Sequence, residues 1–204
     1  MKRQQGFTLV EIAIVLVIIG LLLGGVLKGQ EIITNAKVKN LENSVDGLAA
    51  AIYSYQDRYR AYPGDDSRAT RFPGPVTKVG NDNGVIEGSF DDSGKATESS
   101  YLWLHLRNSG LVSGEIDEKE DAAYAKPRNA FGGLTGAATS GTAAPATSKK
   151  NIIGTYIGFT NIPNPIAIIL ETRADEGDAK KGSIQSNQVD YGTSTNLHQL
   201  YFAI

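Results

Sequence analysis

The feature that most constrains this chain is an apolar run near its N-terminus that contains one carboxylate. Residues 7–27 are apolar almost without interruption, and Glu11 is the one charged side chain among them. With a rise of about 1.5 Å per residue, a helix of this length crosses a hydrocarbon layer of about 30 Å. Lys2 and Arg3 precede the run, and basic flanks tend to stay in the cytoplasm. We therefore expect one membrane-spanning helix, followed by a chain that lies outside the cytoplasm.

A secretory signal peptide also begins with basic residues and continues with an apolar stretch. Two features argue against that interpretation here. An acidic side chain inside the run costs roughly 2.5–3.5 kcal/mol on insertion scales. The run also ends at residues 24–28, Gly-Gly-Val-Leu-Lys, without a small-x-small cleavage site. Glu11 therefore needs another explanation.

The string from Gly6 to Glu11, Gly-Phe-Thr-Leu-Val-Glu, follows Met-Lys-Arg-Gln-Gln. It resembles the processing site of type IV prepilins and of type II secretion pseudopilins. In that family a membrane peptidase cuts after the glycine and methylates the new N-terminal residue. The resemblance implies that residues 1–6 are a leader, that cleavage falls between Gly6 and Phe7, and that Phe7 becomes N-methylated. The apolar helix is then retained in the mature protein.

Cleavage would create an amine at Phe7 and leave the Glu11 carboxylate four residues later in the same helix. Neither charge is stable in lipid. We expect Glu11 to pair with the N-terminal amine of a neighbouring copy, which neutralises both charges in a low-dielectric filament core and sets the axial stagger. The alternative is an isolated carboxylate that the membrane tolerates.

The helical pattern continues over residues 29–62 as an amphipathic segment. Apolar side chains recur there at alternating spacings of three and four, and the stripe consists of Val38, Leu41, Val45, Leu48, Ile52, Tyr55, Tyr59 and Tyr62. Pro63-Gly64 predicts the end of the helix. The predicted divisions are the leader (1–6), a transmembrane and filament-core helix (7–28), the amphipathic continuation (29–62) and an extracytoplasmic head (63–204).

The head begins with a turn-rich connection, and several later segments predict elements of its core. Residues 99–109 predict a short helix that ends at Gly110. Residues 152–160 and 165–172 predict a β-hairpin, because Asn-Ile-Pro-Asn between them has turn chemistry. Alternation of Leu200, Phe202 and Ile204 predicts a last strand.

Residues 132–147 are small and uncharged, which predicts a mobile loop. The resemblance to pilins implies an α+β fold for the whole chain. In that fold a long N-terminal helix, membrane-spanning in its first half, packs on a small antiparallel β-sheet head.

Oxygen-bearing side chains crowd the Gly-rich start of the head and make calcium a possible cofactor, because Ca²⁺ prefers hard oxygen ligands. The candidate ligands are Asp65, Asp66, Asp82, Asn83, Glu87, Asp91 and Asp92. Their spacing does not match an EF-hand, and the alternative is a solvated loop that uses Asp and Asn to form turns. Some pseudopilins bind calcium in a late loop, and the corresponding second set here is Asp175, Glu176, Asp178 and Asp190.

Catalytic chemistry has little support in this sequence, and we expect no enzymatic function. The chain has no cysteine and two histidines, His105 and His198, and no nucleophile elbow, P-loop or HExxH motif accompanies them. His105 lies in an apolar helical stretch, where a packed histidine is expected. A net charge of -2 provides no electrostatic footprint for nucleic acid.

The function that we expect is that of a structural subunit of a type IV pilus-like filament. The partners implied are copies of itself and related pilins, the prepilin peptidase, the inner-membrane assembly machinery and, before assembly, membrane lipid. The location implied is the bacterial inner membrane, with the leader cytoplasmic and the head outside, and then an extracellular or periplasmic filament. A type II secretion pseudopilin is the alternative within the family, and a single-pass membrane-anchored binding module is the alternative outside it.

Overall fold

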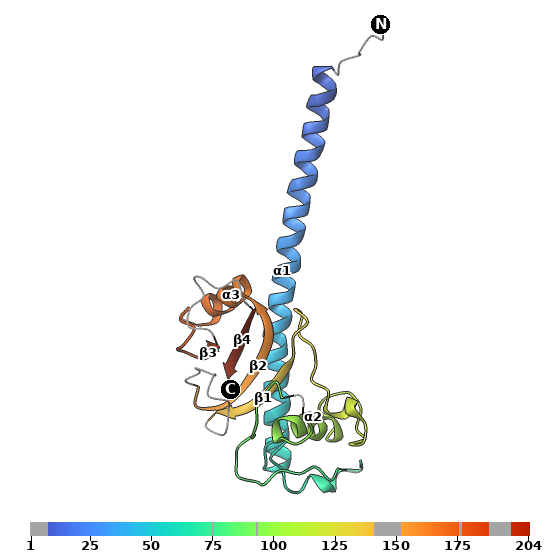
Figure 1. Ribbon diagram of the computed structural model, residues 1–204, viewed down its shortest axis with the longest axis vertical. Coiled ribbons are helices and arrows are strands. Elements are labelled where there is room, and N and C mark those ends of the chain that lie inside the picture. Colours follow the sequence, from blue (N-terminus) through green and yellow to red (C-terminus); the bar gives the residue numbers. More distant parts are fainter. Residues whose placement is uncertain (1–7, 75, 93, 141–151, 176, 188–196) are drawn as a thin grey trace. The chain divides into compact units, whose positions relative to one another are not determined.

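The structure is a computed structural model (Figure 1), which describes residues 8–74, 76–92, 94–140, 152–175, 177–187 and 197–204. It divides into two compact units, Met1–Lys39 and Asn40–Ile204. The long helix α1 (Leu9–Tyr59) contributes to both of them.

In the first unit, the described chain is the beginning of α1. Every residue from Leu9 to Lys28 is exposed, although most of these side chains are apolar. By length and composition α1 is a candidate membrane span, with a mean hydropathy of 2.8 in its most apolar window. The predicted apolar helix is therefore present.

In the second unit, α1 buries the stripe that the sequence predicts. Leu41, Leu48, Ile52 and Tyr55 are buried, and Val45 is half-buried. The helix ends at Tyr59, earlier than the predicted end at Tyr62. The reason is local, since Arg60 adopts a left-handed backbone with φ of 56° and the Arg68 guanidinium bonds the Tyr59 carbonyl at 3.3 Å.

The short helix predicted at residues 99–109 is confirmed as α2 (Glu98–Asn108). It ends in a Schellman motif at Gly110, where φ is 74°. The Leu111 N–H donates to the Leu106 carbonyl at 3.1 Å, and the Gly110 N–H donates to the Arg107 carbonyl at 3.0 Å. Two short 3₁₀ helices, η1 (Ala69–Arg71) and η2 (Asp121–Tyr124), flank it in the chain.

The head contains a four-stranded antiparallel sheet in the order β1-β2-β4-β3. Its strands are β1 (Thr135–Ser140), β2 (Gly154–Pro163), β3 (Ile184–Ser186) and β4 (Leu197–Ala203). The long apolar helix followed by this sheet confirms the predicted α+β class. The predicted last strand is confirmed as β4, which buries Leu200 and Phe202 and ends one residue before Ile204.

An aromatic cluster anchors the sheet through Phe90. The Phe90 ring lies edge to face with Tyr201, at 5.6 Å between centroids, and with Tyr156 at 6.2 Å. Phe90 approaches the strands closely because Gly136 and Gly158 lie beneath it. A Cβ would come within 2.1 Å of the Phe90 carbonyl oxygen at Gly136, and within 2.4 Å of the Phe90 ring at Gly158.

Two predictions about the head are wrong. The predicted hairpin does not form, because the second arm folds as helix α3 (Asn164–Ala174). Pro165 lies in the first turn of α3, where its missing N–H is not needed. One helical face of α3 is buried, consisting of Ile166, Ala167, Leu170 and Glu171.

The predicted mobile loop at residues 132–147 is also wrong in part, because Thr135–Ser140 forms β1 against β2. Ala137 and Ala138 have weak strand propensity, yet both are completely buried in the sheet. Residues 141–147 lie outside the described residues.

Candidate processing and assembly site

The start of α1 is held by a reciprocal pair of side chains, Thr8 and Glu11. The Thr8 backbone N–H and hydroxyl both donate to Glu11 Oε2 at 2.8 Å, and the Glu11 N–H donates to Thr8 Oγ1 at 3.2 Å. This is a capping box, which satisfies two of the N–H groups that the first turn of a helix leaves unpaired. The sequence prediction assigned Glu11 to an intermolecular pair and missed Thr8. The Thr-x-x-Glu spacing was the signal that could have identified it.

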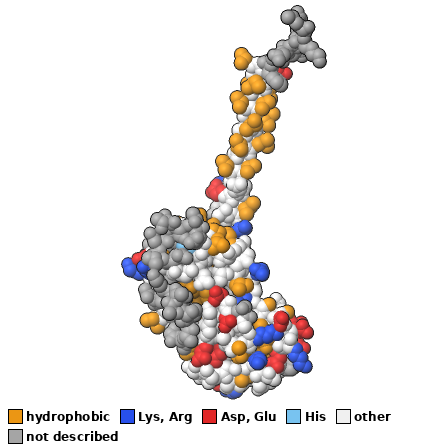
Figure 2. Space-filling model, viewed as in Figure 1, with side chains coloured by type: hydrophobic (Ala, Val, Ile, Leu, Met, Phe, Trp, Pro, Cys, Tyr) orange, Lys and Arg blue, Asp and Glu red, His pale blue; other side chains and the backbone are white. Residues whose placement is uncertain are grey.

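Large apolar side chains are exposed along α1 from Leu9 to Leu27, and Figure 2 shows apolar side chains gathered along the first part of this helix. Leu9 is 91% exposed and Leu21 is 72% exposed in the isolated chain. Soluble monomeric proteins rarely expose continuous apolar surface of this kind, so it marks a surface for lipid or for another protein. The predicted processing residues Gly6 and Phe7 lie outside the described residues.

Comparison with known proteins identifies a known motif in this N-terminal segment. Residues 1–27 match a family model described as a prokaryotic N-terminal methylation motif. The chain is also 28% identical over 133 residues to the fimbrial protein EcpC of Eikenella corrodens, in an alignment that covers 59% of this chain and 87% of EcpC. The chain is type IV pilin-like. Neither match is to an enzyme family, and no solved structure matches the chain.

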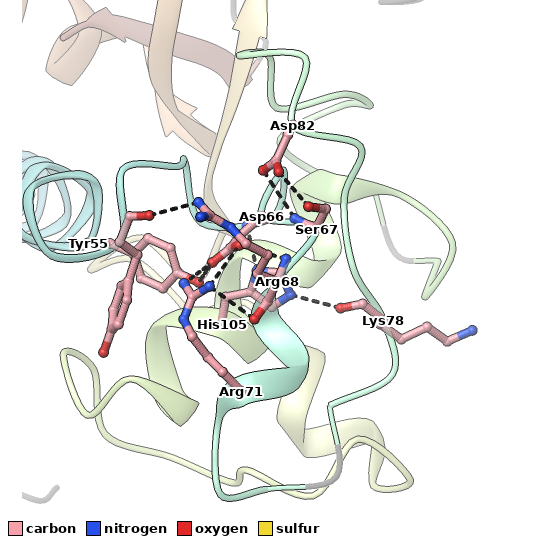
Figure 3. Close-up of polar contacts among 10 residues, drawn as sticks. Tyr55, Asp66, Ser67, Arg68, Arg71, Lys78, Asp82 and His105 are labelled. Atoms are coloured by element: carbon pink, nitrogen blue, oxygen red, sulfur yellow. Dashed lines mark hydrogen bonds and ion pairs between the residues drawn. The ribbon is translucent and has the colours of Figure 1, made fainter.

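The head of this pilin-like chain contains a buried polar cluster around Asp66, between the end of α1 and η1 (Figure 3). Asp66 is completely buried. The Tyr55 hydroxyl donates to Asp66 Oδ2 at 2.6 Å, and the Arg68 backbone N–H donates to Asp66 Oδ1 at 2.9 Å. The Arg71 guanidinium forms an ion pair with the same carboxylate. Burial, and then the bond to Asp66, raise the pKa of the Tyr55 hydroxyl well above its usual range.

His105 lies on α2 next to this cluster, and its hydrogen bonds hold it in one tautomer. Its Nδ1 accepts the Gly64 N–H at 3.0 Å, so Nε2 carries the proton and donates to the Lys78 carbonyl at 2.8 Å. Burial lowers the pKa of the His105 imidazole. Both ring nitrogens are used in the neutral form, so we interpret His105 as a packed, hydrogen-bonded residue.

The acidic residues predicted as calcium ligands are engaged in separate contacts. Asp65 accepts the backbone N–H groups of Asn83 at 3.1 Å and Gly84 at 2.8 Å, and Asp82 accepts the Ser67 N–H at 3.2 Å. Other members accept bonds elsewhere: Glu87 from the Asn83 carboxamide, Asp91 from Gln199 and Asp92 from Gly94. Across the described ranges, no three His, Cys, Asp or Glu side chains are grouped so that they could hold a metal ion. Within the described residues, the predicted calcium ligands therefore do not come together around one point.

The second candidate calcium set is only partly described. Asp175 Oδ2 accepts the Ile184 N–H at 2.7 Å, which joins the end of α3 to β3. Asp178 forms an ion pair with Lys181 at 2.8 Å. Glu176 and Asp190 lie outside the described residues.

Proposed function

We propose that this chain is a structural subunit of a type IV pilus-like filament. It is processed by prepilin peptidase between Gly6 and Phe7 and assembled through its N-terminal helix. The observation that carries the proposal is the methylation motif at residues 1–27, which includes the exposed apolar beginning of α1. Before assembly, lipid of the inner membrane covers that surface. In the filament, the helices of other subunits replace the lipid.

Glu11 is the residue that couples processing to assembly in this proposal. The Thr8 N–H and the Thr8 hydroxyl both donate to Glu11 Oε2. Among the described residues, Glu11 Oε1 accepts no hydrogen bond. One carboxylate therefore serves the capping box and still offers an oxygen to the amine of a neighbouring subunit. Pairing the two charges removes the cost of leaving each alone in a low-dielectric filament core.

The relative that is named as a fimbrial protein favours a pilus over a type II secretion pseudopilin. The partners that follow are copies of this chain and related pilins, the peptidase and the inner-membrane assembly machinery. Lys2 and Arg3 favour an orientation with the leader in the cytoplasm and the head outside. A binding module that stays anchored in the membrane is the remaining alternative, and it would be recovered with membranes and never with sheared filaments.

Intact-mass spectrometry of the native protein tests the proposal most directly. The expected mature species begins at N-methylated Phe7. Gly6→Val should retain residues 1–6, because the peptidase requires a small residue before the cut, whereas the control Gln4→Ala should be processed normally. A dominant species that retains residues 1–6 in cells with active peptidase would contradict the assignment.

A further inference from the structure

The exposed residues 81–84 include the one Asn-Gly pair of the sequence, Asn83-Gly84. Such a pair is chemically labile, because glycine has no side chain to hinder attack by its backbone nitrogen on the asparagine carboxamide. In that reaction the Gly84 nitrogen bonds to Asn83 Cγ, and ammonia leaves with the proton from that nitrogen. Water then opens the resulting succinimide to aspartate or isoaspartate.

The surroundings of Gly84 leave room for this reaction. Asn83 and Gly84 are both exposed, so water reaches them. A Cβ built at Gly84 would meet no atom within 4 Å. Steric crowding therefore does not protect the pair.

Hydrogen bonds do hold the pair in an unreactive arrangement. The Gly84 N–H, which carries the attacking nitrogen, donates to Asp65 Oδ2 at 2.8 Å, and the Asn83 N–H donates to Asp65 Oδ1 at 3.1 Å. The Asn83 carboxamide is fixed at both ends, since its oxygen accepts the Val85 N–H at 2.9 Å and its nitrogen donates to Glu87 at 2.9 Å. Ring closure requires the nitrogen to leave Asp65 and the carboxamide to leave Val85.

Asp65 is itself a rigid support for this arrangement. It is 1% exposed, and its carbonyl accepts the Asp82 N–H at 2.9 Å. Its backbone also lies so close to Gly80 that a Cβ there would come within 2.2 Å of it. Because these contacts hold the buried Asp65 backbone, we expect the bond between the Gly84 N–H and Asp65 Oδ2 to break before the Gly84 nitrogen reaches the Asn83 carboxamide.

We propose that Asn83-Gly84 is a latent self-modification site, in which Asp65 holds the Gly84 amide away from the Asn83 carboxamide. Deamidation then proceeds only through local opening of the segment around Asn83. The product places a new carboxylate near Asp65, Asp82 and Glu87. Repulsion between these like charges disfavours closing of the segment again, so each modified subunit stays open.

Peptide mass spectrometry of full-length protein, aged at neutral pH, measures the rate of this reaction. A free peptide with the sequence of residues 79–88 is the reference, and Asn83→Gln is the unreactive control. We expect the native protein to deamidate at least about tenfold more slowly than the peptide, a factor that corresponds to about 1.4 kcal/mol. An equal rate in protein and peptide would refute the protection.

Asp65→Asn tests the role of the carboxylate, because a carboxamide has one acceptor oxygen for two backbone donors. It should deamidate at a rate close to that of the peptide. Glu98→Gln is the matched control, because Glu98 is also buried and accepts the N–H groups of Asn81 and Glu87 but does not touch the labile pair. Equal acceleration in both variants, or slower reaction in Asp65→Asn, would overturn the proposal. Sub-denaturing urea should accelerate the native protein, which tests the opening step without any substitution.

Discussion

The beginning of α1 and the head differ in what surrounds their apolar side chains. Leu21 in the first unit is 72% exposed, whereas Leu104 in α2 is completely buried. The carboxylates differ in the same way. Glu11 is bonded to a residue three positions away, while Asp66 is buried under Tyr55 and Arg71. The head therefore buries its apolar side chains within itself, whereas the beginning of α1 can bury its own only against lipid or another protein.

The largest effect should come from removing the charge at Glu11. Glu11→Ala and Glu11→Gln should both abolish filaments, because neither can neutralise the amine of a neighbour. Both should leave membrane insertion intact or improved, since a charge leaves the apolar run. Electron microscopy of sheared filaments and membrane fractionation measure the two effects.

Thr8→Val is the matched control for this experiment. It removes the capping hydroxyl and keeps the carboxylate, so filaments should persist while the helix start loses about 1 kcal/mol. Filaments in Glu11→Gln together with their loss in Thr8→Val would show that Glu11 acts through the cap and not through its charge.

The next effect concerns stability of the head. Asp66→Ala leaves the Tyr55 hydroxyl and the Arg71 guanidinium without their buried acceptor, and should cost about 3 kcal/mol. Removing one partner of a buried ion pair costs about 3–5 kcal/mol, and we expect the low end of this range because Arg71 keeps 32% of its side-chain surface in solvent. Urea unfolding of full-length protein in mild detergent, followed by fluorescence of the buried Trp103, measures it. Asp57→Ala is the control, because both side chains of the Asp57–Arg60 pair are 81% exposed, and an equal loss there would contradict the special role of Asp66.

A smaller effect follows from the buried imidazole of His105. Because burial lowers its pKa below the usual 6.5, the unfolded chain takes up a proton first as the pH falls. The contribution of His105 to the free energy of unfolding is therefore present above the usual pKa of 6.5. It decreases as the pH falls below that value, by at most about 1.4 kcal/mol per pH unit. Melting temperatures at pH 7.5 and 5 should differ less in His105→Gln than in wild type. His198, whose pKa burial also lowers, accounts for a residual dependence.

The smallest expected effect is that of calcium on the head. Because Asp65, Asp66 and Asp82 already accept protein donors, the melting temperature should be the same in calcium, magnesium and chelator. A rise in calcium alone, abolished by Asp82→Ala/Asp91→Ala, would show that the head also needs an external partner.

Sequence patterns predicted those parts of the molecule whose structure depends on neighbouring residues. The apolar run, the stripe through Leu41, Ile52 and Tyr55, and the end of α2 at Gly110 were each predicted from spacing. The end of α2 depends on hydrogen bonds between residues a few positions apart. The apolar run and the stripe are recognised from spacing along one helix. The capping box at Thr8 was predictable on the same basis and was missed because Glu11 had already been assigned another partner.

Tertiary structure alone decided the remaining elements. Residues 165–172 are rich in strand-forming side chains, and they form α3 because one helical face is buried in the head; Pro165 permits this helix in its first turn but does not by itself predict it. Ala137 and Ala138 form a strand because β2 supplies the ladder and Phe90 closes over Gly136. The Asp66 cluster joins residues from three separate segments. The N-terminal segment could thus be interpreted from its own chemistry, whereas the head required the free energy of contacts between residues distant in the sequence, which no local pattern records.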